Sequence, residues 1–287
     1  MDYKNLIRKV KSVRDYKNVT VNHEILYELK LFYKNEKKLI DNIELEVFVK
    51  SKDDIYEQLK GLAGYKEKMI EAPHYLIVLS EDKDHYIENT GYIFENVMLK
   101  AYELGVGSCW ITFKDGDAIK KKLMINSDKK LTAIIALGYD DNKSKVVYEN
   151  VSDYNPSKAN IKKVEDNTSD RLGVEDIVFI KEWGKRATVD ELTSRGILDG
   201  FYYGRLAPST LNRQPWRFIV DDEVVVLAIR KDDYINSYED KIDSGIVMLY
   251  FESIIDNTLF DVTWNLGKPE KVYNVPDDFL IVGYCNI

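Results

Sequence analysis

Residues 207–218 read Ala-Pro-Ser-Thr-Leu-Asn-Arg-Gln-Pro-Trp-Arg-Phe, a polar turn that leads directly into an apolar strand. Pro208 and Pro215 fix φ and lack a backbone N–H, so the stretch predicts a shaped loop rather than a helix. Three short polar side chains lie between the prolines: Ser209, Thr210 and Asn212. Such groups at the edge of a strand suit a planar ligand that needs several hydrogen bonds. The alternative is a rigid loop that binds nothing.

The composition is that of a globular protein with one large domain or two smaller ones. Of the 287 residues, 45% are hydrophobic and 31% are charged, so a sizeable core can form. The longest apolar runs, such as 224–229, are too short to span a bilayer. The N-terminus lacks the apolar core of a secretory signal. The two cysteines, Cys109 and Cys285, are too few for a disulfide scaffold. We therefore expect a cytoplasmic location.

The net charge of −8 disfavours nucleic acid as a partner. Residues 1–17 are nevertheless basic, with Lys4, Arg8, Lys9, Lys11, Arg14 and Lys17. This basic arm is either a solvated helix face or a pocket for a small anion such as a phosphate. It lacks interleaved aromatic residues, which again disfavours nucleic acid.

Apolar periodicity predicts the elements of a mixed α and β protein. Helices are expected at 1–10, 22–39, 88–104, 196–206 and 243–255. Strands are expected at 44–49, 75–79, 108–111, 131–137, 216–220, 224–229, 260–264 and 279–282. Residues 140–172 are rich in Asn, Asp, Lys and Ser, which is typical of a linker.

The two halves of the chain share a pattern. Gly91 and Trp110 enclose an apolar helix followed by an apolar strand, and Gly245 and Trp264 enclose the same pattern at the same separation. Each half then ends in a Gly-Tyr pair, at 138–139 and 283–284. Duplication of one domain is the favoured interpretation, and a chance likeness of two α/β stretches is the alternative.

Residues 207–218 resemble the flavin-contacting segment of the FMN-dependent nitroreductase family, which reads roughly A-P-S-x-x-N-x-Q-P-W-x-F. Residues 105–112, Gly-Val-Gly-Ser-Cys-Trp-Ile-Thr, are similar to the family's G-L-G-S-x-W-I stretch beside the flavin ring. Family members are usually homodimers that clamp each flavin between subunits. One subunit supplies an R-R-S-x-R motif, which Lys-Ser-Val-Arg at 11–14 resembles, with Val10 at the position of the first arginine.

The proline–tryptophan loop occurs only in the second half, so the chain resembles the tandem branch of this family. The resemblance implies an α+β, duplicated nitroreductase-like fold with mixed or antiparallel sheets flanked by helices. Residues 1–140 and 174–287 would be the two halves of an intramolecular pseudo-dimer, and 141–173 the linker. Setting Phe48 against Phe218 places Asn42 opposite Asn212, so one complete site and one degenerate site are expected.

The resemblance also implies which residues bind FMN. They are Lys11, Ser12, Arg14, Ile111, Thr112, Lys143, Lys145, Pro208, Ser209, Thr210 and Asn212. Arg14 would lie near the pyrimidine edge of the flavin and stabilise its anionic reduced form. Trp216 and Cys109 are predicted to be buried and structural. The aromatic run 201–203 would line either the pocket or the core. No pair of histidines has metal-ligand spacing, so no metal is expected.

The expected activity is that of an FMN-dependent oxidoreductase. NADH or NADPH would be the electron donor, and a nitroaromatic or quinone-type small molecule the acceptor, by ping-pong hydride transfer through the flavin. No side-chain acid or base is required, because the flavin carries the chemistry. The protein would be a monomer that acts as a pseudo-dimer, with further dimerisation left open and no nucleic acid or membrane partner. The alternative is a flavin- or ligand-binding protein, or a scaffold, without catalysis.

Overall fold

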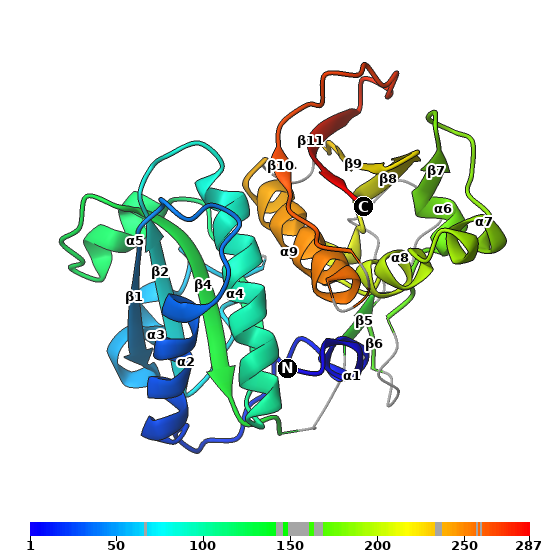
Figure 1. Ribbon diagram of the computed structural model, residues 1–287. Helices are drawn as coiled ribbons and strands as arrows, with labels where there is room; N and C mark the ends of the chain where they lie inside the picture. Colours follow the sequence, from blue (N-terminus) through cyan, green and yellow to red (C-terminus); the bar gives the residue numbers. More distant parts are fainter. Residues whose placement is uncertain are drawn as a thin grey trace.

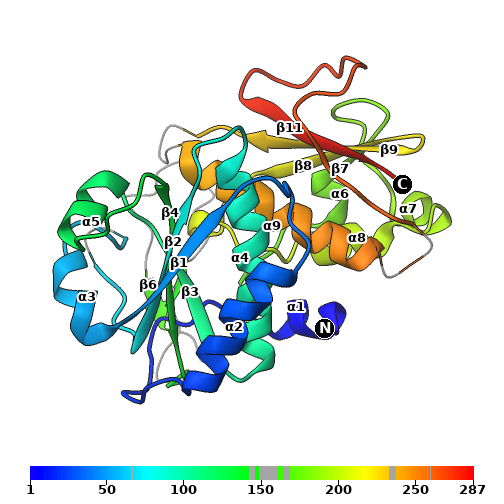
Figure 2. The ribbon, with the colours of Figure 1, turned by 60° about the vertical axis from the view of Figure 1, so that its left-hand side comes forward.

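The computed structural model describes residues 1–65, 68–141, 146–148, 161–163, 169–232, 237–256, 258 and 260–287. Two β-sheets lie on either side of a pair of long helices, α4 (Tyr86–Glu103) and α9 (Ser237–Ile255) (Figure 1). The two helices also lie side by side in the turned view of Figure 2. The paired helices therefore form the central layer of the molecule.

The first sheet contains only antiparallel neighbours. Its strands are β1 (Leu45–Ser51), β2 (His74–Ser80), β3 (Gly107–Ile111) and β4 (Lys130–Gly138), in the order β1-β2-β4-β3. Successive side chains of β2 point to opposite faces. Leu76 and Val78 join the core that contains α4, whereas Ile77 and Leu79 pack in the cluster that contains residues of α3 (Lys52–Leu59) and α5 (Gly116–Lys122). Both faces are covered, so every residue of β2 is buried, including the polar His74 and Ser80 at its ends.

The second sheet is mixed. Its strands are β7 (Val178–Ile180), β8 (Trp216–Asp221), β9 (Val224–Arg230), β10 (Asn265–Leu266) and β11 (Phe279–Asn286), in the order β10-β11-β9-β8-β7. Only the pair β7–β8 is parallel. Without the edge strand β7, the order β8-β9-β11-β10 repeats the order β1-β2-β4-β3, and every corresponding pair is antiparallel. The expected α+β architecture of antiparallel and mixed sheets with flanking helices is confirmed.

The remaining elements surround these layers. They are α1 (Tyr3–Lys9), α2 (His23–Asn35), α6 (Val174–Ile177), α7 (Val189–Ser194), α8 (Leu198–Gly204), a short 3-10 turn at Thr210–Asn212, and the antiparallel pair β5 (Val146–Tyr148) and β6 (Ile161–Lys163). Helix α1 reaches the second half of the chain, where Lys4 forms an ion pair of 2.5 Å with Asp199. Within the described ranges, no helix is both long enough and apolar enough to cross a bilayer.

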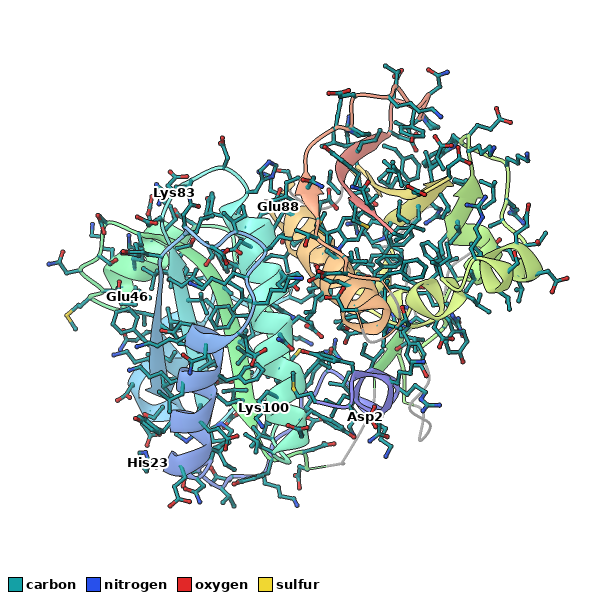
Figure 3. The ribbon with its side chains drawn as sticks, viewed as in Figure 1. Asp2, His23, Glu46, Lys83, Glu88 and Lys100 are labelled. Atoms are coloured by element: carbon teal, nitrogen blue, oxygen red, sulfur yellow. The ribbon has the colours of Figure 1, made fainter. Side chains whose placement is uncertain are left out.

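Two glycines allow α4 and α9 to approach closely. A Cβ on Gly91 would collide with the carbonyl oxygen of Ile242, and a Cβ on Gly245 would collide with the carbonyl oxygen of Glu88. Glu88 is labelled in Figure 3 near the upper ends of the two helices. Glu88 precedes Gly91 by the same interval as Ile242 precedes Gly245, so the two contacts are equivalent. Reciprocal contacts of this kind characterise a twofold interface.

Several predicted elements differ from the structure. The helix expected at 22–39 ends at Asn35, and the helix expected at 243–255 already begins at Ser237. The prediction of a strand at 260–264 is wrong, because the strand pairing in this region is confined to β10, which begins one residue later. The carboxylate of Asp256 accepts a hydrogen bond from the backbone N–H of Val262 at 2.7 Å, which engages that backbone in a loop.

Candidate functional site

The loop of residues 207–215, here called the proline loop, joins α8 to β8. Leu211, Asn212 and Gln214 have positive φ values of 57°, 55° and 49°. Non-glycine residues rarely adopt this left-handed conformation, so the surrounding structure must hold it in place. The Oγ of Ser209 accepts a hydrogen bond from the backbone N–H of Gln214 at 2.9 Å and closes the loop. The prediction of a shaped loop is confirmed.

A side chain of α9 anchors the proline loop. The backbone N–H of Thr210 donates to the carboxylate of Asp243, with an N–O distance of 3.1 Å. The first half contains an equivalent contact, in which the N–H of Ile40 donates to Oδ1 of Asn89 in α4 at 2.9 Å. Ile40 lies opposite Thr210 when Asn42 is set against Asn212. Both halves therefore attach this loop to the central helix in the same way.

The side chains of Asn212 and Gln214 bind a segment that sequence analysis placed in the linker. Arg171 donates to Oδ1 of Asn212, whose Nδ2 donates to the carbonyl of Asp170 at 3.0 Å. Oε1 of Gln214 accepts from the N–H of Leu172 at 2.8 Å. Sequence reasoning missed Arg171, because one arginine at the end of a polar linker gives no distinctive signal.

A group of carboxylates surrounds Arg213 of the proline loop. Its guanidinium forms an ion pair with Asp240 and lies 3.4 Å from Asp232 and 3.9 Å from Asp243. Burial raises the pKa of Asp243 to about 8, against the opposing effects of the Arg213 charge and the Thr210 N–H. The carboxyl that anchors the loop therefore retains a proton near neutral pH.

The basic turn, residues 10–14, lies alongside β3. Ser12 and Ser108 form a parallel bridge, and the N–H of Val13 donates to the carbonyl of Ser108 at 2.9 Å. Arg14 is exposed, and its guanidinium lies 3.5 Å from the carbonyl oxygen of Ser12. Cys109 is buried, as predicted, and burial raises the pKa of its thiol. The basic turn and the 105–112 stretch are thus brought together.

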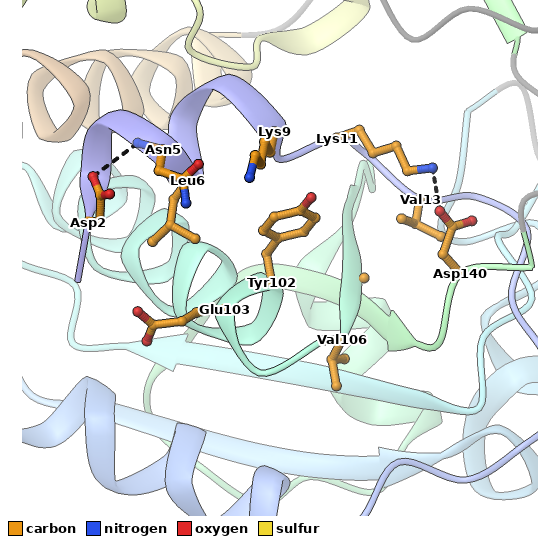
Figure 4. A pocket seen from close by; sticks show the side chains of 12 residues that line it. Asp2, Asn5, Leu6, Lys9, Lys11, Val13, Tyr102, Glu103, Val106 and Asp140 are labelled. Atoms are coloured by element: carbon orange, nitrogen blue, oxygen red, sulfur yellow. Dashed lines mark hydrogen bonds and ion pairs between the residues drawn. The ribbon is translucent and has the colours of Figure 1, made fainter.

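Lys11 differs from the other members of the basic turn, because its ammonium forms an ion pair with Asp140. Both residues line a hollow of about 430 Å³ in the first half of the chain, where the side chains of Lys9 and Tyr102 face each other (Figure 4). Residues 208–212 do not line this hollow. This hollow is therefore formed without the proline loop.

Buried polar contacts connect β3 to the second half. Glu95 of α4 is 1% exposed, and its carboxylate accepts from Nε1 of Trp110 at 2.8 Å and from the hydroxyl of Tyr250 at 2.9 Å. Burial raises the pKa of Glu95 to about 6, although both hydrogen bonds lower it. Tyr250 interacts electrostatically with Arg171, which contacts Asn212. This series of contacts links the strand beside the basic turn to the proline loop.

The remaining candidate residues occupy several environments. Ile111 is buried in β3, so only its backbone could contact a ligand, and the carbonyl of Thr112 accepts from the N–H of Gly64 at 2.8 Å. The next residue, Phe113, contacts Tyr238 of α9 with ring centroids 5.2 Å apart. Lys143 and Lys145 lie outside the described residues.

Several core assignments can also be compared with the structure. Trp216 is fully buried, which confirms its predicted role in the core. In the aromatic run, Phe201 and Tyr203 are buried, whereas Tyr202 is exposed. Tyr202 is therefore the member of this run that remains accessible.

A second hollow, also of about 430 Å³, lies beside the first-half counterpart of the proline loop. Asn42 and Ile43 line it together with Trp264, Asn265 and Leu266. Trp264 corresponds to Trp110, so the hollow combines the counterparts of the two stretches that were expected to bind the flavin. It contains neither a proline–tryptophan loop nor a basic turn.

Comparisons with known proteins agree with this architecture. A family model described as "Putative TM nitroreductase" matches residues 2–255. The crystal structure of a "putative nitroreductase" from Thermotoga maritima MSB8 aligns with a TM-score of 0.59 and 16% identity, covering 100% of this chain and 94% of that one. No curated protein sequence matches the chain.

Two further solved structures each align with about half of the chain. An FMN-dependent nitroreductase from Clostridium difficile R20291 has a TM-score of 0.41 and 23% identity, covering 53% of this chain and 91% of that one. Iodotyrosine deiodinase bound to FMN and 3-iodo-L-tyrosine has a TM-score of 0.42 and 20% identity, and the alignment covers 48% of this chain and 90% of that one.

Proposed function

The chain belongs to the family described as "Putative TM nitroreductase", and on this premise we propose that it is an FMN-dependent NAD(P)H oxidoreductase. Nitroaromatic or quinone-type small molecules would be the electron acceptors, and donor and acceptor would use the same site in turn. The proposal depends mainly on one observation. Three residues of the proline loop have a left-handed conformation, and the loop is linked through Arg171, Tyr250 and Glu95 to β3, which lies beside the basic turn.

The donor set fits a flavin mononucleotide. Ser209, Thr210 and Asn212 offer hydroxyl and amide groups for the ring and ribityl chain, and Pro208 shapes the loop between them and α8. On the other side, Ser12 and the exposed guanidinium of Arg14 offer a hydroxyl and a cation beside β3. Bound FMN would supply the hydride chemistry, and the protein would bind and orient it and set its local charge.

We propose that residues 1–140 and 174–287 are the two halves of a pseudo-dimer joined by 141–173. The shared strand order, the reciprocal glycine contacts and the equivalent loop anchors support this division. The tether would keep the second half at a high effective concentration near the first, so a monomer could form the site alone. A cytoplasmic location and the absence of nucleic-acid or membrane partners belong to the same proposal.

The first test is whether the purified protein binds FMN. We expect a yellow protein, or an apo-protein that FMN reconstitutes, and bleaching by NADH or NADPH under anaerobic conditions. Asn212→Ala and Arg14→Ala should each weaken FMN retention. Asn42→Ala is the matched control, because it removes the corresponding amide from the first half. An equal loss in all three variants would argue against a single complete site.

A second candidate function is flavin or ligand binding without turnover, or a scaffold role. The observation that favours it is that Asn212 already binds Arg171 and the carbonyl of Asp170, so both ends of its amide are engaged. A protein that binds FMN but is not bleached by either nicotinamide donor would support ligand binding. A colourless protein that FMN cannot reconstitute would support a scaffold.

A further inference from the structure

Two arginines flank the proline loop. Arg205 follows the last residue of α8 and lies three residues before Pro208, the first proline of the loop. Arg171 contacts Asn212 within the loop. The guanidinium of Arg205 donates to the carbonyl oxygen of Leu172 at 3.2 Å, and Leu172 directly follows Arg171. Both side chains are half-buried. The two cations are therefore neighbours at the edge of the proposed flavin site.

Neither arginine forms an ion pair with a carboxylate in the part of the chain that the structure describes. Two other arginines of the same half do form such pairs, since Arg213 has three carboxylates within 4 Å and Arg186 lies 3.2 Å from Asp176. Burial lowers the pKa of Arg171, Tyr250 opposes this shift, and the like charge of Arg205 adds to it. The positive charge at this place is not neutralised by the described side chains.

Arg205 also has an unused donor. Its Nε is buried and has no hydrogen-bond partner among the described residues. The guanidinium carbon lies 4.8 Å from the ring centroid of Tyr202, which supports one face of the plane. Leaving a buried charged donor unpaired is costly, so a bound acceptor at this place would be favourable.

The chemistry of the missing acceptor follows from these groups. Two neighbouring cations with planar, forked donors match the oxygens of a phosphate, to which guanidinium groups bind with two parallel hydrogen bonds. A neutral acceptor would satisfy Nε of Arg205, but it would leave the two like charges uncompensated. An anion with several oxygens satisfies both requirements.

We propose that Arg171 and Arg205 together bind a phosphate-type oxyanion beside the proline loop. The proposal rests on the function proposed above, in which both the flavin and the nicotinamide donor carry phosphates. It assigns phosphate binding to residues of the linker end and the second half, whereas Lys11 of the basic turn is paired with Asp140. The oxyanion belongs either to the cofactor or to the electron donor.

The first experiment uses inorganic phosphate, which requires no cofactor to bind. Phosphate should raise the melting temperature of the flavin-free wild-type protein relative to chloride at equal ionic strength. The double variant Arg171→Gln/Arg205→Gln should lose this increase. Arg186→Gln removes the same charge from an arginine that is already paired, so it should retain the increase. Equal stabilisation of the wild type and the double variant by phosphate would overturn the proposal.

The second experiment identifies the source of the phosphate by comparing FMN with riboflavin, which lacks the phosphate. If FMN is the source, each single variant should lower the FMN-to-riboflavin affinity ratio about tenfold and leave riboflavin binding unchanged. If the donor is the source, that ratio should stay constant, and the KM for NADH should rise while that for reduced nicotinamide riboside does not. A change in neither would overturn the proposal.

Two controls separate the possible failures. Arg205→Lys retains the charge without the fork and should keep part of the phosphate effect, whereas a variant that merely misfolds would lose its cooperative melting transition. A wild type that responds to phosphate but binds no flavin would overturn the proposed oxidoreductase function and support the oxyanion site.

Discussion

The crossing of α4 and α9 gives a sharp prediction, because a single methyl group should separate the two halves. A Cβ on Gly245 would lie 2.7 Å from the backbone nitrogen of Tyr92 and closer still to the carbonyl oxygen of Glu88. A Cβ on Gly91 would lie 3.1 Å from the Cα of Ile242 and closer to its carbonyl oxygen. These obstacles are backbone atoms, which cannot rotate away as a flexible side chain can.

The expected cost follows from the displacement required. Nonbonded carbon contacts are most favourable at about 3.5–4.0 Å, so Gly245→Ala would require the helices to move apart by roughly 1 Å. Overpacking of this kind costs about 1–3 kcal/mol. We expect Gly245→Ala to lie at the upper end of that range, with Gly91→Ala somewhat less destabilised. Gly204→Ala in α8 is the control, because a Cβ there would meet no atom within 4 Å.

Urea denaturation provides the measurement. Gly204→Ala should be neutral or stabilise the protein by up to about 1 kcal/mol, because alanine favours a helix over glycine. The midpoints of the two interface variants should fall, by about 0.7 M for a loss of 2 kcal/mol at a slope of about 3 kcal/mol/M. If Gly245→Ala unfolds within about 0.5 kcal/mol of the wild type, the helices do not pack through this glycine.

The acidic residues at the central helices yield further predictions. Asp243→Asn should preserve the acceptor for the Thr210 N–H, as Asn89 does for Ile40. Asp243→Ala should lower the stability by about 1 kcal/mol, because it leaves that partly buried N–H without its acceptor. Because the pKa of Asp243 is raised, the folded state retains a proton that the unfolded state has released. The stability of the wild type should therefore fall as the pH rises towards 8. Over the same pH change, the urea midpoint of Asp243→Asn should fall less than that of the wild type. Parallel pH profiles for the two proteins would refute this. The raised pKa of Glu95, about 6, predicts a smaller loss of stability as the pH rises towards 6. Glu95→Gln should remove this loss, which urea midpoints measured at pH 5 and pH 7 would reveal. In anaerobic FMN titrations, Asn212→Ala and Arg14→Ala should bind FMN more weakly than the wild type, and Asn42→Ala should bind it with unchanged affinity.

The residues that could be predicted from the sequence are those whose roles depend on local patterns. The buried strand β2, the helix α4 and the shape of the proline loop follow from apolar spacing and from the restricted φ of proline. The equal separation of Gly91 from Trp110 and of Gly245 from Trp264 indicated related halves, and the two glycines do occupy equivalent helix contacts.

Roles that depend on distant partners could not be predicted in this way. Lys11 is a phosphate candidate, and its ion pair with Asp140, far along the chain, could not be foreseen from the sequence. Arg171 looked like one more polar linker residue, and only the fold places it against Asn212. The residues 260–264 have an apolar character typical of a strand, but Trp264 instead donates its Nε1 to the carbonyl of Met248 at 3.2 Å and packs beside α9. Charge pairing and tertiary packing decided these cases.

The reciprocal glycine contacts also bear on how the two halves can diverge. Since each central helix rests on its counterpart, substitutions in the half without the proline–tryptophan loop can erase ligand chemistry yet must preserve its supporting surface. The first half would then be retained for its packing against α9, even where its own ligand-binding residues have changed.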